Sequence, residues 1–202
     1  MWPSRWRRMD KERIAEGVRL VLQGLGVGDE VLRDTSGRVA TMLAEELCWG
    51  LGRDPAEALG KTLPNPGTGM VILKGIPFHS LCEHHLLPFI GRAGIAYFPG
   101  ERIAGLDGLV RVLETAAAKP QLQERLGEEV ADALERALRP KGVLVHLEAE
   151  HLCLSLRGPR KQALLETVAA RGLFAQDKEL LAQALSRIKG RYNGPVKNSR
   201  PR

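Results

Sequence analysis

Aromatic side chains, cysteines and long apolar runs are all scarce in this sequence of 202 residues. Phe, Trp and Tyr make up only 4% of it, so few rings are available to stack on nucleic acid bases. The three cysteines, an odd number, argue against a disulfide framework and favour a reducing compartment. No apolar run is long enough to predict a membrane span. The first residues lack the apolar stretch of a secretory signal, and we therefore expect a cytoplasmic protein.

Acidic residues are absent from the C-terminal segment 187–202, which holds six basic residues. These six account for the whole formal net charge of +6, because the 24 basic residues before them balance 24 acidic ones. The segment also contains Gly, Asn and Pro, which disfavour a folded element. We therefore predict a basic disordered tail at 189–202. Because the rest of the chain has no net basic charge, we expect no nucleic acid partner.

The remaining composition, 44% hydrophobic and 27% charged, is typical of a soluble globular protein. Apolar residues at helical spacing predict a helix over 10–25. The Asp-Thr-Ser cluster at 34–36 is a typical N-cap and predicts the start of a second helix. Residues 54–69 are rich in Pro and Gly and predict a junction. We therefore assign 1–65 to an N-terminal helical arm and 66–188 to the main domain.

Strands are expected on either side of a helical pair in the main domain. The segments 143–149 and 151–157 both alternate, with no turn residue between them, so we favour one long strand with a bulge or bend over a hairpin. Residues 161–170 are ambiguous between strand and helix. The other expected strands are 70–76, 90–98 and 102–104, and the expected helices are 107–118, one from Pro120 through Leu138, and 178–188. This order predicts an α+β fold with an antiparallel sheet.

The stretch from Ser80 to Phe89 concentrates the metal-binding residue types of the chain. Cys82 and His85 lie three residues apart, which is half of a common zinc site, and His151-Leu-Cys153 offers a second half. Together they supply two thiolates and up to three imidazoles, enough for three ligands and an open fourth position, as in a catalytic zinc site. A lone cysteine or histidine is more often a core or surface residue, and we interpret Cys48 in that way. The clustering favours a metal.

Two further motifs could carry chemistry. Period-two spacing would place His151, Cys153 and Arg157 on one strand face, and the alternative is the solvent-facing side of an edge strand. Glu124 follows Pro120 at a helix start, where a carboxylate usually serves only as a partner of the helix dipole. It could instead accept two N–H bonds from a guanine edge. The residue types alone do not separate these alternatives.

Several of these motifs resemble the signatures of the GTP cyclohydrolase I family, in matching order over roughly residues 30–188. The matching segments are Asp34-Thr35 with Arg38-Val39, Cys82 through Phe89, Gly105-Leu106 with Arg111, Gln123 through Leu126, His151-x-Cys153 and Arg157-Gly158. The resemblance implies an α+β tunnelling fold that assembles as a homodecamer with active sites between subunits. It also implies a hydrolase of tetrahydrofolate biosynthesis and one-carbon metabolism that opens the guanine ring of GTP, releases formate and forms 7,8-dihydroneopterin triphosphate.

The resemblance implies roles for residues at matching positions. Zinc (Zn2+) would be held by Cys82, His85 and Cys153, and its water would attack C8 of the guanine ring. His84 and His151 would transfer protons, with His151 near the ribose ring oxygen.

The same resemblance implies a set of substrate contacts. Glu124, with Gln123 beside it, would hold the pyrimidine edge of guanine. Arg111 and Arg157 would contact the triphosphate, for which the arginine fork is well suited. Arg38 would reach phosphate from a neighbouring subunit.

The phosphate-binding positions depart from the family pattern. Asp107-Gly108 replaces the usual Ser-Lys, so a lysine is lost and a carboxylate gained, four residues before Arg111. Residues 159–165 replace a Ser/Thr-rich stretch, and Arg160 and Lys161 could compensate. One alternative function is therefore the same chemistry on a less phosphorylated or different purine. Another is a non-catalytic homologue that binds a pterin or purine, which retention of the zinc positions disfavours.

Overall fold

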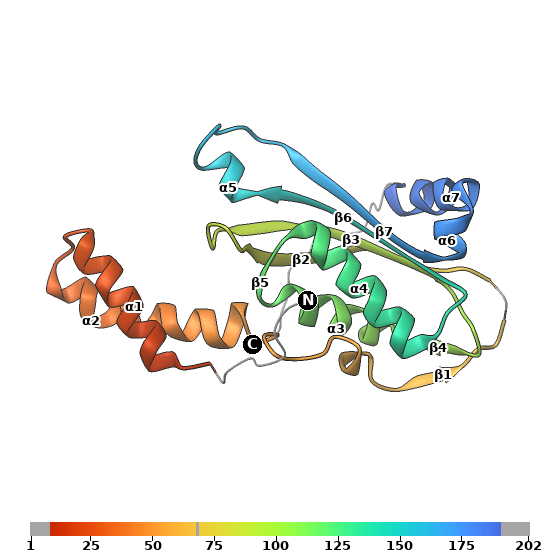
Figure 1. Ribbon diagram of the computed structural model, residues 1–202, viewed down its shortest axis with the longest axis horizontal. Helices are drawn as coiled ribbons and strands as arrows, with labels where there is room; N and C mark the ends of the chain where they lie inside the picture. Colours follow the sequence, from red (N-terminus) through yellow and green to blue (C-terminus); the bar gives the residue numbers. More distant parts are fainter. Residues whose placement is uncertain (1–8, 68, 191–202) are drawn as a thin grey trace.

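The computed structural model describes residues 9–67 and 69–190, so only the first two residues of the predicted tail, Lys189 and Gly190, lie inside the described part. The main domain is built on a curled five-stranded sheet with helices on both faces, and a helical arm extends from it (Figure 1). The predicted α+β class with an antiparallel sheet is confirmed. No helix among the described residues is both long and apolar enough to cross a bilayer.

The five-stranded sheet has the order β5-β2-β3-β6-β7. β2 (Val71–Cys82), β3 (Pro88–Phe98), β6 (Gly142–His151) and β7 (Leu164–Gly172) are antiparallel to their neighbours. The short β5 (Pro120–Gln121) runs parallel to the last residues of β2. Most of the segment 161–170, which the sequence left ambiguous between strand and helix, is therefore strand. It belongs to β7, which forms one edge of this sheet.

Two helices cover one face of the sheet and enclose the larger core. α3 (Leu106–Ala117) and α4 (Gln123–Leu138) are amphipathic, and their apolar residues recur every three or four positions. In α4 the side chains of Leu126, Val130 and Leu134 are wholly buried. Strong helical periodicity in the sequence therefore identified the face that packs against the strands.

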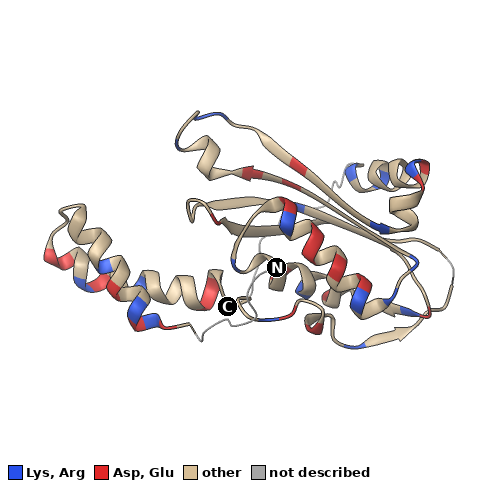
Figure 2. Cartoon of the chain, in the orientation of Figure 1, with Lys and Arg blue, Asp and Glu red and all other residues tan. Residues whose placement is uncertain are grey.

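The opposite face of the sheet is covered at one end by α6 (Leu173–Gln176) and α7 (Lys178–Lys189). These helices form a second, smaller core with β3 and β6, in which Phe174 and Ala184 are buried. Lys74 of β2 donates to the carbonyls of Arg187 and Gly190 and so holds the end of α7. Charged residues of both signs lie along α4, whereas the strands are mostly uncharged (Figure 2).

The arm consists of α1 (Lys11–Gly24) and α2 (Asp29–Thr41), which pack against each other, followed by a π-helical segment, Met42–Leu47. The expected N-cap at 34–36 is wrong, because these residues lie inside α2 and Gly28 is the N-cap. The hydroxyl of Ser36 bonds the carbonyl of Leu32 one turn back. Ser and Thr favour N-caps, but inside a helix their hydroxyl can bond the carbonyl four residues back, as Ser36 does here.

The junction after the arm is attached to the main domain. A 3₁₀ turn, Glu57–Leu59, is followed by β1 (Thr62–Pro64), which pairs with β4 (Arg102–Ala104) in a separate two-stranded sheet. Residues 62–64 therefore bond to the main domain, although the predicted boundary at 65 assigns them to the arm.

The expected long strand through Arg157 is wrong. β6 ends at His151, and Leu152–Ser155 form the helical turn α5, closed by a bond from the Leu156 amide to the Leu152 carbonyl. The leucines at 152, 154 and 156 alternate as in a strand, but Leu156 is 63% exposed and therefore makes no core face. His151, Cys153 and Arg157 do not share a strand face.

Two expected helix starts are also displaced. α4 begins at Gln123 rather than at Pro120, because Pro120 and Gln121 pair with the end of β2 as β5. α3 has Gly105 as its N-cap, and Asp107 lies in its first turn. The first displacement matters for function, since it brings the start of α4 to the end of β2 that carries Cys82.

Candidate active site

Three strands meet at one end of the sheet and bring distant residues together. In the register, Ser80 of β2 lies opposite Phe89 of β3, which lies opposite His151 of β6. Cys82 ends β2 two residues after Ser80, and Cys153 follows β6 in α5. The sheet pairing therefore determines that the two cysteine-containing segments converge.

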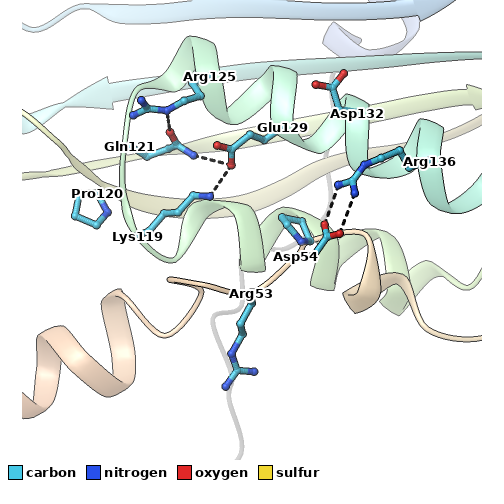
Figure 3. A pocket seen from close by; sticks show the side chains of 10 residues that line it. Arg53, Asp54, Lys119, Pro120, Gln121, Arg125, Glu129, Asp132 and Arg136 are labelled. Carbon is cyan, nitrogen blue, oxygen red and sulfur yellow. Dashed lines mark hydrogen bonds and ion pairs between the residues drawn. The ribbon is translucent and has the colours of Figure 1, made fainter. Parts of the chain in front are cut away.

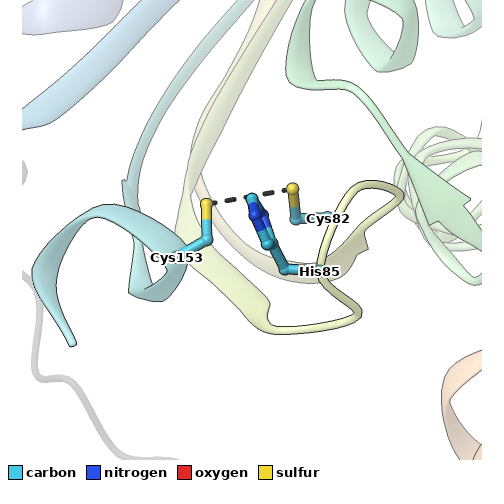
Figure 4. Close-up of side chains that lie close together, drawn as sticks. All are labelled: Cys82, His85 and Cys153. Carbon is cyan, nitrogen blue, oxygen red and sulfur yellow. Dashed lines mark hydrogen bonds between the residues drawn. The ribbon is translucent and has the colours of Figure 1, made fainter. Parts of the chain in front are cut away.

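Cys82, His85 and Cys153 form a cluster whose ligand atoms all lie within 4.8 Å of one another (Figure 4). The two Sγ atoms are 3.8 Å apart. Two thiolates bound to one zinc ion at about 2.3 Å with tetrahedral angles would be about 3.8 Å apart. The residues therefore fit a zinc ion, with the imidazole of His85 as third ligand and one position open to water or substrate.

The cluster is closed on one side and open on the other. Cys82 is 5% exposed, Cys153 is partly buried, and His85 is exposed at the tip of the turn. Burial, together with the neighbouring Cys82 thiol, raises the pKa of Cys153. A metal ion that binds Cys153 as the thiolate must therefore displace its proton.

The turn that presents His85 is fixed by the backbone and by a partly buried ion pair. The amide of Cys82 donates to the carbonyl of Leu87, and Leu86 takes a left-handed conformation with φ of 54°. Glu83 is bound by Arg125 of α4, which also donates to the side chain of Gln121 at 2.6 Å. The bond between Arg125 and Glu83 was not predicted from the sequence. The sequence indicates only that Gln121 and Arg125, four residues apart, can contact each other.

His151 lies beside the cluster and is held on two sides. Its Nε2 is 2.9 Å from Oε1 of Gln123, and its ring stacks on Phe89 with centroids 4.6 Å apart and planes 2° apart. Burial lowers the pKa of His151, and the nearby Glu124 carboxylate partly opposes this effect. Glu124 itself is exposed in the first turn of α4. The structure therefore groups His151, Gln123 and Glu124 at the end of β6 that leads into Cys153.

His84 and Arg157 border the open side. The His84 side chain is 64% exposed, with Nε2 4.0 Å from a carboxylate oxygen of Glu83. Arg157 is exposed, and its Nη1 lies 2.7 Å from Nε2 of His85. Because the guanidinium of Arg157 contacts His85 of the cluster, it lies within reach of an anionic group on a molecule bound there.

Arg111 and Arg38 do not reach this site within one chain. The C-terminal end of α3 lies at the site, since Ser80 bonds the carbonyl of Ala117. Arg111 and Asp107 are in the first half of that helix, and ten residues of helix place Asp107 about 15 Å from Ala117. Arg38 lies in the arm, where its guanidinium contacts Asp34 at 3.4 Å.

The departure at Asp107-Gly108 has a structural consequence. Asp107 pairs with Arg111, as its spacing predicts, and this pairing lowers the pKa of Asp107. Arg111 also donates to the carbonyls of Ala58 and Leu59. A Cβ atom at Gly108 would lie 2.4 Å from the Leu59 carbonyl oxygen, so no larger residue fits while this loop is docked.

A charged hollow of about 720 Å³ is lined by residues 53–55, the segment around β5, and α4 (Figure 3). Most of its charges are paired with one another: Lys119 with Glu129, and Arg136 with Asp54. Gln121 links Arg125 to Glu129 at its inner end. The hollow is therefore part of the support of the turn.

The fold holds a Cys-His-Cys donor set that could bind a metal ion and leave one position open. The family model of GTP cyclohydrolase I matches residues 14–189. GTP cyclohydrolase 1 of Streptococcus pneumoniae (strain Taiwan19F-14) is 49% identical over 180 residues, which cover 87% of this chain and 97% of that relative. GTP cyclohydrolase 1 of Pelotomaculum thermopropionicum is 46% identical over 185 residues, 90% of this chain and 98% of that relative. The chain belongs to the GTP cyclohydrolase I family.

A solved structure, the archaeosine synthase QueF-Like in the apo form, is also similar in part. It is 17% identical, with a TM-score of 0.44, over 52% of this chain and 96% of that chain.

The cluster predicts about one zinc ion per chain, as a site with two thiolates and an imidazole implies. Cys153→Ala should lose the metal, because only one thiolate and one imidazole remain. Cys48→Ala is the matched control, since this cysteine is buried and lies outside the cluster. Metal content by mass spectrometry should fall near zero in the first variant and stay unchanged in the second. Full retention in Cys153→Ala would refute the ligand assignment.

Proposed function

We propose that this protein is a zinc-dependent GTP cyclohydrolase I, which opens the imidazole ring of GTP, releases formate and forms 7,8-dihydroneopterin triphosphate. The observation that carries the proposal is the convergence of Cys82, His85 and Cys153 in a chain of this family. We place it in the cytoplasm, in tetrahydrofolate biosynthesis and one-carbon metabolism.

The chemistry is divided between the metal and the two histidines. Zinc, when held by Cys82, His85 and Cys153, supplies a Lewis acid that makes water a nucleophile near neutral pH. His151 transfers a proton from its fixed position against Phe89, and burial keeps its ring neutral over more of the pH range. The exposed His84 transfers a proton on the open side, where a substrate would enter.

Binding of the nucleotide uses groups of opposite charge. Glu124, an acceptor-only carboxylate at the start of α4, is suited to the N–H groups of the guanine edge. Arg157 is suited to phosphate because its guanidinium lies at the open side of the cluster. Gln123 was expected to share the guanine contact, but its side chain is wholly buried.

The assembly we propose is a homo-oligomer, and a decamer by family resemblance, with sites completed by neighbouring chains. Two features support it. Arg38 and Arg111 lie away from the cluster of their own chain. The arm also exposes Leu20, Val21 and Leu25, each more than half accessible, which a second chain would cover.

Formate release tests the function directly. Zinc-loaded protein should release one formate per GTP consumed, and less or none from GDP, GMP and guanosine if the triphosphate is bound. The measurement is formate by coupled assay, with Cys153→Ala as the control. No formate from any guanine nucleotide would contradict the proposal and favour a non-catalytic purine or pterin binder.

Subunit mixing tests whether sites are shared. Arg38→Ala and Cys153→Ala should each be inactive, but a mixture that is dissociated and reassembled should regain activity. If one chain supplies the metal ligands and another supplies Arg38, about one quarter of the sites in a random equal mixture are intact. Each variant reassembled alone is the control. A fully active Arg38→Ala, or a mixture with no recovery, would show that Arg38 completes no neighbouring site.

Asp107 is predicted to weaken triphosphate binding, because it adds a negative charge and engages Arg111. Asp107→Ser should lower the KM for GTP by roughly two- to fivefold, the range of an exposed ion pair, and change that for GMP less. Restoring the lysine at Gly108 is no suitable test, since its side chain would displace Leu59. Equal changes for GTP and GMP, or none, would show that other groups hold the triphosphate.

A further inference from the structure

Gln123 is wholly buried although it is the first residue of α4 and lies beside the exposed Glu124. Its amide nitrogen donates to the carbonyls of Leu147 at 3.2 Å and Leu165 at 2.9 Å. It also lies 3.3 Å from the hydroxyl of Thr167. Both N–H groups of the amide are therefore used inside the protein, by acceptors on β6 and β7.

These contacts determine which end of the amide faces His151. If the amide were flipped, its oxygen would face two carbonyl oxygens, and none of these atoms can donate a proton. The oxygen therefore faces Nε2 of His151, at 2.9 Å. Since this oxygen only accepts, Nε2 of His151 must carry a hydrogen.

The protonation of Nε2 fixes the chemistry of the other ring nitrogen. In a neutral imidazole with hydrogen on Nε2, Nδ1 carries the lone pair. Stacking on Phe89 holds the plane of the ring. Among the described residues, the His151 ring has no hydrogen-bond partner other than Gln123. Nδ1 is thus the one nitrogen free to exchange a proton with a bound molecule.

We propose that Gln123 is a positioning residue, which fixes the tautomer and the orientation of His151 so that Nδ1 transfers the proton. It does not contact guanine, because its amide has no N–H left to donate and no surface exposed to a ligand. The inference rests on the proposed function for the substrate and for proton transfer by His151. The hydrogen-bond geometry stands without it.

A double-mutant cycle tests this role. Gln123→Met keeps the length of the side chain and removes its polar atoms. It should lower kcat for GTP by roughly 10- to 100-fold, the usual range for a residue behind a site ligand, with KM within twofold. In a His151→Ala background the same change should cost less than about threefold, because a group that acts through His151 has nothing left to position. Equal losses in both backgrounds, or a loss confined to KM, would overturn the proposal.

Binding without turnover separates positioning from guanine recognition. The ligand is 7-deaza-GTP, which keeps the pyrimidine edge and the triphosphate but has carbon in place of N7. Titration calorimetry should give the same affinity for the wild type and Gln123→Met, and tenfold or more weaker binding for Glu124→Gln. Tenfold weaker binding by Gln123→Met would instead show that Gln123 holds guanine. Thr167→Val, which removes only the longest contact to the amide nitrogen, is the control for packing damage and should leave kcat unchanged.

A spectroscopic measurement on the wild type keeps the test independent of whether the variants fold or turn over. Solid-state NMR of zinc-loaded protein with ¹⁵N-labelled histidine reports the tautomer of each ring, and the His151 signals are those missing from His151→Ala. Neutral His151 should carry hydrogen on Nε2. Hydrogen on Nδ1 would overturn the proposal, whereas absence of formate release from the wild type would overturn only the proposed function.

Discussion

The meeting of Cys82 and Cys153, 71 residues apart in the chain, is the contact on which the rest of the site depends. It exists because the last residues of β2, the first residues of β3 and the last residues of β6 lie at the same end of the sheet. The turn after β2 and the helical turn after β6 therefore lie side by side. Burial and the neighbouring Cys82 thiol raise the pKa of Cys153, so a metal ion that binds its thiolate displaces a proton. Such an ion would link the two turns and stabilise the folded state by an amount that grows with the logarithm of its affinity.

A second constraint is the direction of α3. Its C-terminal end bonds Ser80 at the site, and its N-terminal end is fixed to the loop before β1 by Arg111. A helix with both ends fixed cannot bring Arg111 to the metal cluster of its own chain. We therefore propose that Arg111 serves the site of a neighbouring chain, while Arg157 lies at the cluster of its own chain. The Leu59 carbonyl leaves no room for a side chain at Gly108 while this loop is docked.

The sequence was most informative where one strong periodicity or one specific spacing decided the structure. The apolar stripe of α4 and the grouping of Cys82, His85 and Cys153 were both found in this way, because few packings satisfy them. The path after His151 was predicted wrongly, because three alternating leucines fit a strand and a short turn equally well until their exposure is known. The bonds from Gln123 to His151 and from Arg125 to Glu83 join segments far apart in sequence. Neither leaves a local pattern, and both require the three-dimensional register.

The central claim, a catalytic zinc site made by Cys82, His85 and Cys153, is tested most directly by zinc X-ray absorption of the purified protein. The account predicts two sulfur neighbours at about 2.3 Å and lighter nitrogen or oxygen neighbours at about 2.0–2.1 Å. Replacement of His85 by Ala, which also leaves only two ligands, should lose the zinc as Cys153→Ala does. A zinc ion with four sulfur neighbours, or with none, would contradict the account.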